Sequence, residues 1–147
     1  MAAVGLSTIR SRLATATDAI AGFSISRNPF AHFGRSPQTV SHLRFAVGIM
    51  SSAARDDDRQ REAQGIYSET VMGIRFAYRL PPKDQIAGYD GAFDAAQAVI
   101  ASITNISPAV HANINLRYLR LSPSVSTAGE YMILTIEFEV LHFIPLI

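Results

Sequence analysis

The fold is decided by residues 71–80, which read Val71-Met-Gly-Ile-Arg-Phe-Ala-Tyr-Arg-Leu80. Large apolar residues alternate in this segment with small or charged ones. One face carries Met72, Ile74, Phe76, Tyr78 and Leu80, and the other carries Val71, Gly73, Arg75, Ala77 and Arg79. A period of two is typical of a β-strand with one buried face. The segment therefore predicts a strand that packs one face on a core and turns its arginines away from it.

A second alternating segment precedes this strand, with Leu43, Phe45, Val47 and Ile49 on one face and His42, Arg44, Ala46 and Gly48 on the other. We expect the two strands to form an antiparallel hairpin. Its tip, residues 51–65, is polar and has no apolar period. Two-residue turns are the commonest hairpin connections, so a tip of this length indicates a functional or a disordered segment.

Two amphipathic helices are predicted around this hairpin. The first, residues 3–23, spaces its apolar side chains three or four residues apart. Pro81 and Pro82 end the strand, since proline cannot donate to a ladder, and Asp84 can cap a second helix at 84–104. The apolar stripe of that second helix consists of Ile86, Tyr89, Phe93, Ala96, Val99, Ile100 and Ile103.

Two further strands, residues 113–121 and 130–143, are expected to form a second hairpin. The element order is then α-β-β-α-β-β. This order predicts an α+β fold with a mainly antiparallel four-stranded sheet and helices packed on one face. The chain of 147 residues has a suitable length for a single domain spanning residues 1–147.

The sheet face turned away from the helices carries charge, contributed by Arg44, Arg75, Arg79, Arg117, Glu137 and Glu139. One interpretation is a set of cross-strand ion pairs on a solvated face, which adds little stability. The other is a face that packs on a neighbouring subunit or lines a channel, because arginine suits paired interface charges. The apolar run 141–147 leaves a similar choice between a contact surface and a tail folded on its own core.

The composition excludes several classes of function. The chain is 48% hydrophobic and 17% charged with a net charge of +1, which argues against disorder and against a generic nucleic-acid binder. It has no cysteine, so thiolate metal sites and cysteine nucleophiles are excluded. No apolar run reaches the ~18 residues of a membrane helix, and residues 1–20 are too interrupted by charge for a signal peptide. We expect a soluble, non-secreted domain.

No arrangement of residues predicts catalysis. The histidines stand alone, at positions 32, 42, 111 and 142, and lack the spacing of a metal site. The acidic run 56–58 lies among arginines and indicates solvated charge. Phosphate-binding loops and nucleophile elbows are missing. We therefore predict a protein that is not an enzyme and has no catalytic residue, metal or cofactor.

The order of the pieces is informative where single motifs are not. The chain places an amphipathic helix before Phe45-Ala-Val-Gly48 and a long polar hairpin tip, and Gly73-Ile-Arg-Phe-Ala-Tyr-Arg-Leu80 follows. After these come Gly88-Tyr-Asp-Gly-Ala-Phe-Asp-Ala-Ala-Gln-Ala-Val-Ile100 and a strand pair that ends in Leu134-Thr-Ile-Glu-Phe-Glu-Val-Leu-His142. From residue 43 to 143, this order resembles the tail terminator proteins of long-tailed, siphovirus-like bacteriophages and related phage-like particles. The chain departs from them in having no tryptophan and no basic tail.

The resemblance implies a structural virion protein at the head–tail interface, assembled in the host cytoplasm. Such proteins form a homo-hexameric ring that caps the tail tube, ends its polymerisation and joins the tail to the head connector. The implied partners are the tail tube protein, the head–tail connector or stopper protein, and DNA that passes through the channel without sequence-specific binding; no membrane is involved. Ring closure needs two different complementary patches on each subunit.

The charged sheet face is then a candidate for the subunit interface or the channel. The candidates for contact with an axial neighbour lie in the hairpin tip and are Arg55, Asp56, Asp57, Asp58, Arg59 and Arg61. Two alternatives stay open. The chain is another neck component, such as the stopper or tail-completion protein, or it is a small-ligand-binding or enzymatic α+β domain. A ligand site would have to use Tyr78, Tyr89, Tyr118 and His111.

Overall fold

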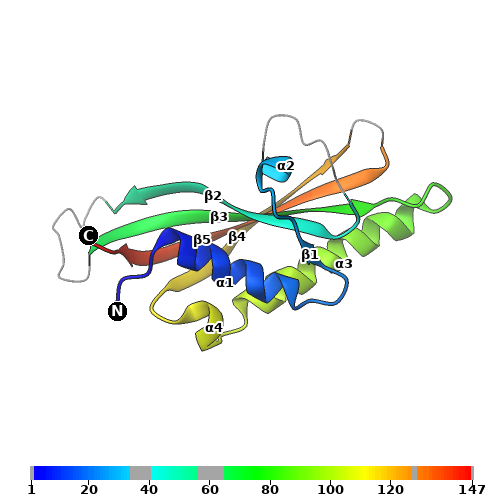
Figure 1. The fold of residues 1–147 in the computed structure, drawn as a ribbon. Helices are drawn as coiled ribbons and strands as arrows, with labels where there is room; N and C mark the ends of the chain where they lie inside the picture. The colour runs from blue at the N-terminus through cyan, green and yellow to red at the C-terminus, as the bar shows by residue number, and fades with distance from the viewer. Residues whose placement is uncertain (1, 34–40, 56–64, 127–128, 147) are drawn as a thin grey trace.

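The structure, a computed structural model, describes residues 2–33, 41–55, 65–126 and 129–146 (Figure 1). The helices are α1 (Leu6–Asp18), α2 (Phe30–Phe33), α3 (Gln85–Thr104) and α4 (Pro108–His111). The strands are β1 (Ser24–Ile25), β2 (Arg44–Ala54), β3 (Ile66–Arg79), β4 (Asn115–Val125) and β5 (Tyr131–Ile144). The fold class is α+β, as the sequence predicted.

The sheet has five strands in the order β1-β2-β3-β5-β4. All neighbours are antiparallel except β1, which runs parallel to β2. The prediction of a four-stranded sheet and of the order α-β-β-α-β-β is therefore wrong in detail. β1 has only two residues, too few to show an alternating pattern. The N–H of Ser26 nevertheless donates to the Phe45 carbonyl at 2.7 Å.

The core lies between α1, α3 and one face of the sheet, which we call the inner face. The largest fully buried side chains of the sheet meet there and include Phe45, Phe76 and Phe138. α1 is shorter than the predicted helix at 3–23: it ends at Asp18, and the chain turns at Gly22, whose φ is +88°. This turn brings the Phe23 ring within 5.1 Å of the Phe76 ring, measured between centroids. α3 starts as expected, with the Asp84 carboxylate accepting from the Ala87 N–H at 3.1 Å.

The opposite sheet face, the outer face, also carries a helix. α2 packs on it, and Figure 1 shows α2 on the other side of the sheet from α1 and α3. A Cβ on Gly48 would lie 3.1 Å from the Phe33 ring, and Gly73 is its partner in the ladder. Because Gly48 has no side chain, the Phe33 ring can pack against the strand there; at Gly73 the nearest side chain is that of Met50. The two predicted helices, α1 and α3, pack together on the inner face as expected, and α2 is an additional helix on the outer face.

The hairpin between β2 and β3 is longer than predicted, and its tip is shorter. A bulge at Met50 shifts the register, and pairing then continues from Ser51 opposite Val71 to Ala54 opposite Ser68. The sequence did not predict this extension, because residues 51–54 are small and show no apolar alternation. Backbone pairing does not require such a pattern. The tip is thus confined to residues 55–65, of which 56–64 lie outside the described residues. The C-terminal run is largely strand, since β5 continues to Ile144 opposite Ile66.

A buried histidine joins the N-terminal segment to the sheet. His142 is 0% exposed and its Nδ1 lies 2.8 Å from the Val4 carbonyl, so Nδ1 carries the proton and donates it. Its Nε2 accepts from the Thr70 hydroxyl at 2.8 Å, and Thr70 in turn accepts from Ser52 at 2.9 Å. The Val4 N–H donates to the Phe143 carbonyl at 2.9 Å. These bonds hold the two ends of the chain at one end of the sheet (Figure 1).

Candidate functional site

The outer face collects the charged residues that the sequence singled out. The ladder places Arg75 opposite Thr135, Gly73 opposite Glu137, and Arg117 opposite Glu139. Arg44 and Arg79 precede and follow buried inner-face residues on their strands, so they belong to the same face. The structure therefore brings all six predicted residues onto one surface, but it gives them different environments.

On β4 and β5 the charges are paired across the strands. The Arg117 guanidinium binds Glu139 with two hydrogen bonds, Nε to Oε1 at 2.8 Å and a terminal nitrogen to Oε2 at 3.2 Å. The hydrogen bond raises the pKa of Arg117 and lowers the pKa of Glu139. Arg120 binds Glu137, with 3.2 Å between Nε and Oε2. These are the cross-strand pairs of the first interpretation above.

Arg120 was missed because a bulge moves it. The register of β4 shifts between Tyr118 and Arg120, so both Arg117 and Arg120 reach the outer face although they are three residues apart. Strict alternation would turn Arg120 toward the inner face. The sequence did contain one indication of the role of Arg120. Glu137 and Glu139 share one face of β5, so two cationic side chains are expected opposite them.

Glu69 extends this cluster onto β3 and was also missed. Its side-chain hydrogen bond to Glu139 raises the pKa of Glu69, and repulsion between the two carboxylates adds to the rise. Arg55 and Arg117 oppose the rise electrostatically. The Arg55 guanidinium lies 5.9 Å from the centre of the Tyr67 ring. Arg55, predicted as an axial-contact residue, is thus linked to the outer face; Asp56, Asp57, Asp58, Arg59 and Arg61 lie outside the described residues.

Arg75 has a different environment, since its donors are used within the chain. Its Nε donates to the Thr135 hydroxyl at 2.8 Å, and a terminal nitrogen donates to the His32 carbonyl at 2.8 Å. Its guanidinium lies 4.8 Å from the centre of the Phe33 ring. Burial lowers the pKa of Arg75. The residue therefore holds α2 on the sheet, and a contact with a neighbouring subunit is not needed to explain it.

His32 is buried under the same contact. Its Nε2 donates to the Arg44 carbonyl at 3.1 Å. Nδ1 has no hydrogen-bond partner in the described part of the chain. Burial lowers the pKa of His32, and the neighbouring Arg44 and Arg75 lower it further, so the ring is neutral. It supports α2 and is 3% exposed, which leaves it out of reach of a ligand.

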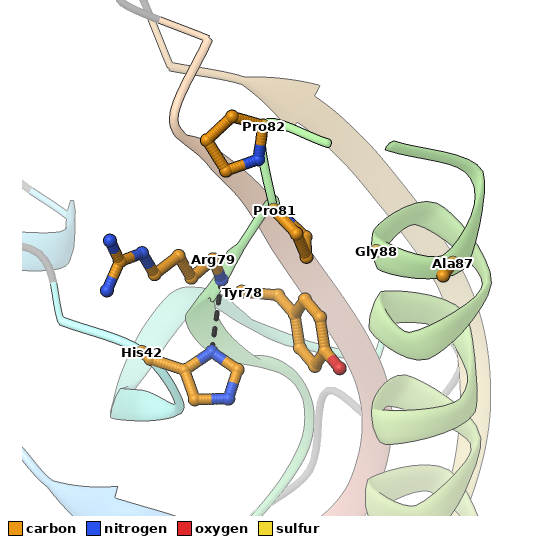
Figure 2. A pocket seen from close by; sticks show the side chains of 7 residues that line it. All are labelled: His42, Tyr78, Arg79, Pro81, Pro82, Ala87 and Gly88. Carbon is orange, nitrogen blue, oxygen red and sulfur yellow. Dashed lines mark hydrogen bonds between the residues drawn. The ribbon is translucent and has the colours of Figure 1, made fainter. Parts of the chain in front are cut away.

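A pocket of about 580 Å³ lies beside the end of β3, and Figure 2 shows the seven residues that line it. His42 and Tyr78 form an edge-to-face pair with 4.6 Å between ring centres. The His42 Nδ1 accepts from the Arg79 backbone N–H at 3.0 Å, and burial and the Arg79 charge lower the pKa of His42. The Arg79 side chain points away from α3 (Figure 2). The remaining wall is formed by Pro81, Pro82, Ala87 and Gly88.

The residues proposed for a ligand site are not brought together. Tyr78 lines this pocket, whereas Tyr118 lines a separate groove beside Phe93. His111 bonds the Ile103 carbonyl at 2.7 Å, and Tyr89 is 54% exposed on α3. Within residues 2–33, 41–55, 65–126 and 129–146, no group of three or more His, Asp or Glu side chains is arranged to hold a metal ion.

Comparison with known proteins adds no relative. No protein-family model matches the chain, and no curated protein matches its sequence. Among the described residues, no helix has both the length and the apolar character needed to cross a membrane. The function of this chain must therefore be inferred from the surfaces described above.

Proposed function

We propose that this chain is a structural virion protein, the tail terminator of a long-tailed phage or of a related phage-like particle. In this role it forms a homo-hexameric ring that caps the tail tube, ends tube polymerisation and joins the tail to the head connector. The outer face lines the channel through which DNA passes. The proposal assigns the protein no reaction, metal or cofactor.

The observation that carries the proposal is the pairing of charges on the β4–β5 half of the outer face. Arg117 and Arg120 are each held by a glutamate of β5. Free arginines on a channel wall would bind DNA phosphates, since affinity rises with the number of basic contacts. Arginines neutralised by neighbouring carboxylates leave a hydrated surface with little net attraction for DNA. A channel wall of this kind lets DNA pass without binding it tightly.

The shape of the sheet also supports the proposal. β3 and β5 have 14 residues each and pair along their whole length. At about 3.3 Å per residue, this ladder spans roughly 45 Å. A long, fully paired ladder is a stiff element suited to the wall of a ring. Ile66 pairs with Ile144 at one end of this ladder, and the segment that precedes Ile66 in the chain, residues 55–65, is the proposed contact with an axial neighbour.

Electron microscopy and light scattering of the purified protein test the proposal. We expect six-fold rings with the mass of six 16.0-kDa subunits, formed alone or at the ends of tail tubes. Deleting the protein from its particle should give abnormally long tubes, because nothing then ends polymerisation. A protein that stays monomeric and never associates with tubes would contradict the proposal.

The hairpin tip gives a more local test. Replacing residues 56–64 with a short glycine-serine linker leaves β2 and β3 whole. We expect the thermal unfolding midpoint to stay close to that of the wild type, while tube capping is lost. Capping at wild-type efficiency would show that the tip makes no axial contact.

Another neck component, such as the stopper or tail-completion protein, is the neighbouring possibility, and the same deletion distinguishes it. Loss of a stopper leaves tails of normal length and heads that leak DNA. Loss of a terminator changes tube length.

Small-ligand binding is the second candidate, favoured by the pocket in Figure 2. Its volume of about 580 Å³ falls within the range of small-molecule sites, and its walls are mostly apolar with few polar groups. A ligand-dependent rise of the unfolding midpoint across a metabolite panel would support this function. Tyr78→Ala should abolish that rise, and Tyr89→Ala, at an exposed position outside the pocket, should not.

A further inference from the structure

Among the described residues, both edges of the sheet lack a strand partner over most of their length. β1 pairs with β2 only at Arg44 and Phe45. From Val47 to Ala54, the outer edge of β2 has no strand partner in the part of the chain that the structure describes. At the other edge, β4 pairs with β5 alone. An open edge presents unpaired N–H and C=O groups to another chain.

The edge of β2 has no protection by charge, although the bulge at Met50 interrupts its register. No charged residue occurs from Phe45 to Ala54, although exposed edges normally carry lysine or other charges that prevent pairing. Ile49 and Met50 are 43% and 42% exposed. They border a groove of about 420 Å³. Its lining is Arg10, Pro29, Phe33, Val47, Gly48, Ile49 and Met50.

The edge of β4 has an apolar groove of its own. It lies between α3 and β4, has a volume of about 420 Å³, and is lined by Phe93, Gln97, Ile100, Ala101, Tyr118 and Leu121. Tyr118 is 41% exposed. The neighbouring Tyr89 ring lies 4.9 Å from the Phe93 ring, centre to centre. Each edge of the sheet therefore offers apolar surface, and the two surfaces differ in composition.

The two edges also carry opposite charge. Arg10 lines the β2 groove, and Arg27 is exposed just after β1. α3 contains no lysine or arginine, and Asp90 and Asp94 are exposed beside its groove residues. The described residues offer neither aspartate a salt-bridge partner. The arginines of β4 do not cancel this charge, because Glu137 and Glu139 already pair with them.

From these edges we infer an interface between copies of this chain, in which the α3/β4 edge of one subunit docks on the α1/β2 edge of the next. Asp90 and Asp94 then face Arg10 and Arg27 across the apolar grooves. Because the two surfaces differ, the contact is heterologous and repeats head to tail, as a closed ring requires. The inference rests on the proposed ring and names the surfaces that build it.

Reversal of the charges tests the inference. Arg10→Glu/Arg27→Glu places like charges at every contact, and so does Asp90→Arg/Asp94→Arg. Each double variant should weaken self-association about ten-fold or more, measured by sedimentation velocity. Combining all four changes in one chain, or mixing the two double variants, restores opposite charges at each contact and should restore assembly. Lys83→Glu and Glu130→Arg are the controls, since both residues are exposed and lie away from the grooves.

Disulfide trapping gives a second readout, because the chain has no cysteine. Ile49→Cys combined with Tyr118→Cys should give a ladder of covalent oligomers under oxidation, whereas each single variant should stay unlinked. Dimers formed by a single variant would indicate a symmetric contact and overturn the inference. Rings that form normally in the charge-reversed variants would overturn the inference and leave the proposed function standing. A wild-type chain that neither assembles nor caps tubes would remove both.

Discussion

Among the single residues, His142 couples folding most directly to pH. Its ring is fully buried between β3, β5 and the N-terminal segment, and burial lowers the pKa of His142 from 6.5. The unfolded chain therefore binds a proton at a pH where the folded chain does not. Stability is complete above the unfolded pKa, and it falls as the pH drops below 6.5 toward the lower folded value.

We expect the thermal unfolding midpoint to be lower at about pH 5 than at about pH 8. His142→Gln should narrow this difference, because the amide can still bond Val4 but takes up no proton. The difference should persist in part, since burial also lowers the pKa values of His32 and His42. Tyr89→Ala, at an exposed position outside this hydrogen-bond network, is the control and should keep the wild-type difference. An equal difference in the wild type and His142→Gln would contradict the prediction.

Among the elements, α3 is shaped by small residues. Its buried line consists of Gly88, Ala92, Ala96, Val99 and Ile103. Two glycines in a helix cost about 1 kcal/mol each relative to alanine, so their presence at 88 and 91 needs a structural reason. A Cβ on Gly88 would lie 2.6 Å from Cδ of Pro81. A Cβ on Gly91 would meet the Tyr78 hydroxyl. The helix can approach the end of β3 only without these side chains.

Gly88→Ala should therefore destabilise the protein by about 1–3 kcal/mol despite the better helix propensity of alanine. The proline ring cannot rotate away, and the helix would have to shift. Gly91→Ala should cost less, because its neighbour is the end of a side chain that can move. Urea denaturation measures both. If Gly88→Ala stabilised the protein, the close approach of α3 to Pro81 would be disproved.

The small residues also explain which parts of the fold the sequence could predict. The strands with large alternating side chains, at 43–49 and 71–80, were recognised, and so was the Asp84 cap. The stripe through Ile86 and Tyr89 was wrong, since these residues are 77% and 54% exposed. Hydrophobicity predicts that isoleucine is buried in preference to glycine. In α3 the reverse holds, because the helix packs so closely at Gly88 that only a glycine fits there. The bulges at Met50 and Leu119 and the short β1 depend on backbone pairing, which leaves no side-chain pattern.

For the candidate site, the sequence predicted which residues share a face but not which partners they bind. Alternation placed all six charged residues on the outer face correctly. Alternation did not reveal that Arg75 holds α2 on the sheet. With only four residues, α2 is too short to show the apolar periodicity of a helix. The partners Arg120 and Glu69 depend on a register shift and on a diagonal contact between strands, which only the assembled sheet defines.

For the whole molecule, the balance of charge on the outer face should control attraction for DNA. Glu137→Gln/Glu139→Gln removes two carboxylates and leaves Arg117 and Arg120 unpaired. We expect stronger non-specific binding to duplex DNA, with a salt dependence steeper by about two phosphate contacts, measured by fluorescence anisotropy. Asp18→Asn/Glu130→Gln changes the net charge equally at exposed positions off this face, and should bind DNA as the wild type does. Equal binding by both variants would show that net charge alone matters.

The pairing of β3 with β5 has a consequence for how the protein reaches this state. The central ladder joins β3 to β5, with Ile66 opposite Ile144, so it cannot close until residue 144 has left the ribosome. Until β5 has left the ribosome, the β2–β3 hairpin has an apolar face that β5 does not yet flank. Contacts so distant along the chain slow folding to about milliseconds or longer. Synthesis of many copies at once would therefore expose this hairpin to mispairing between nascent chains.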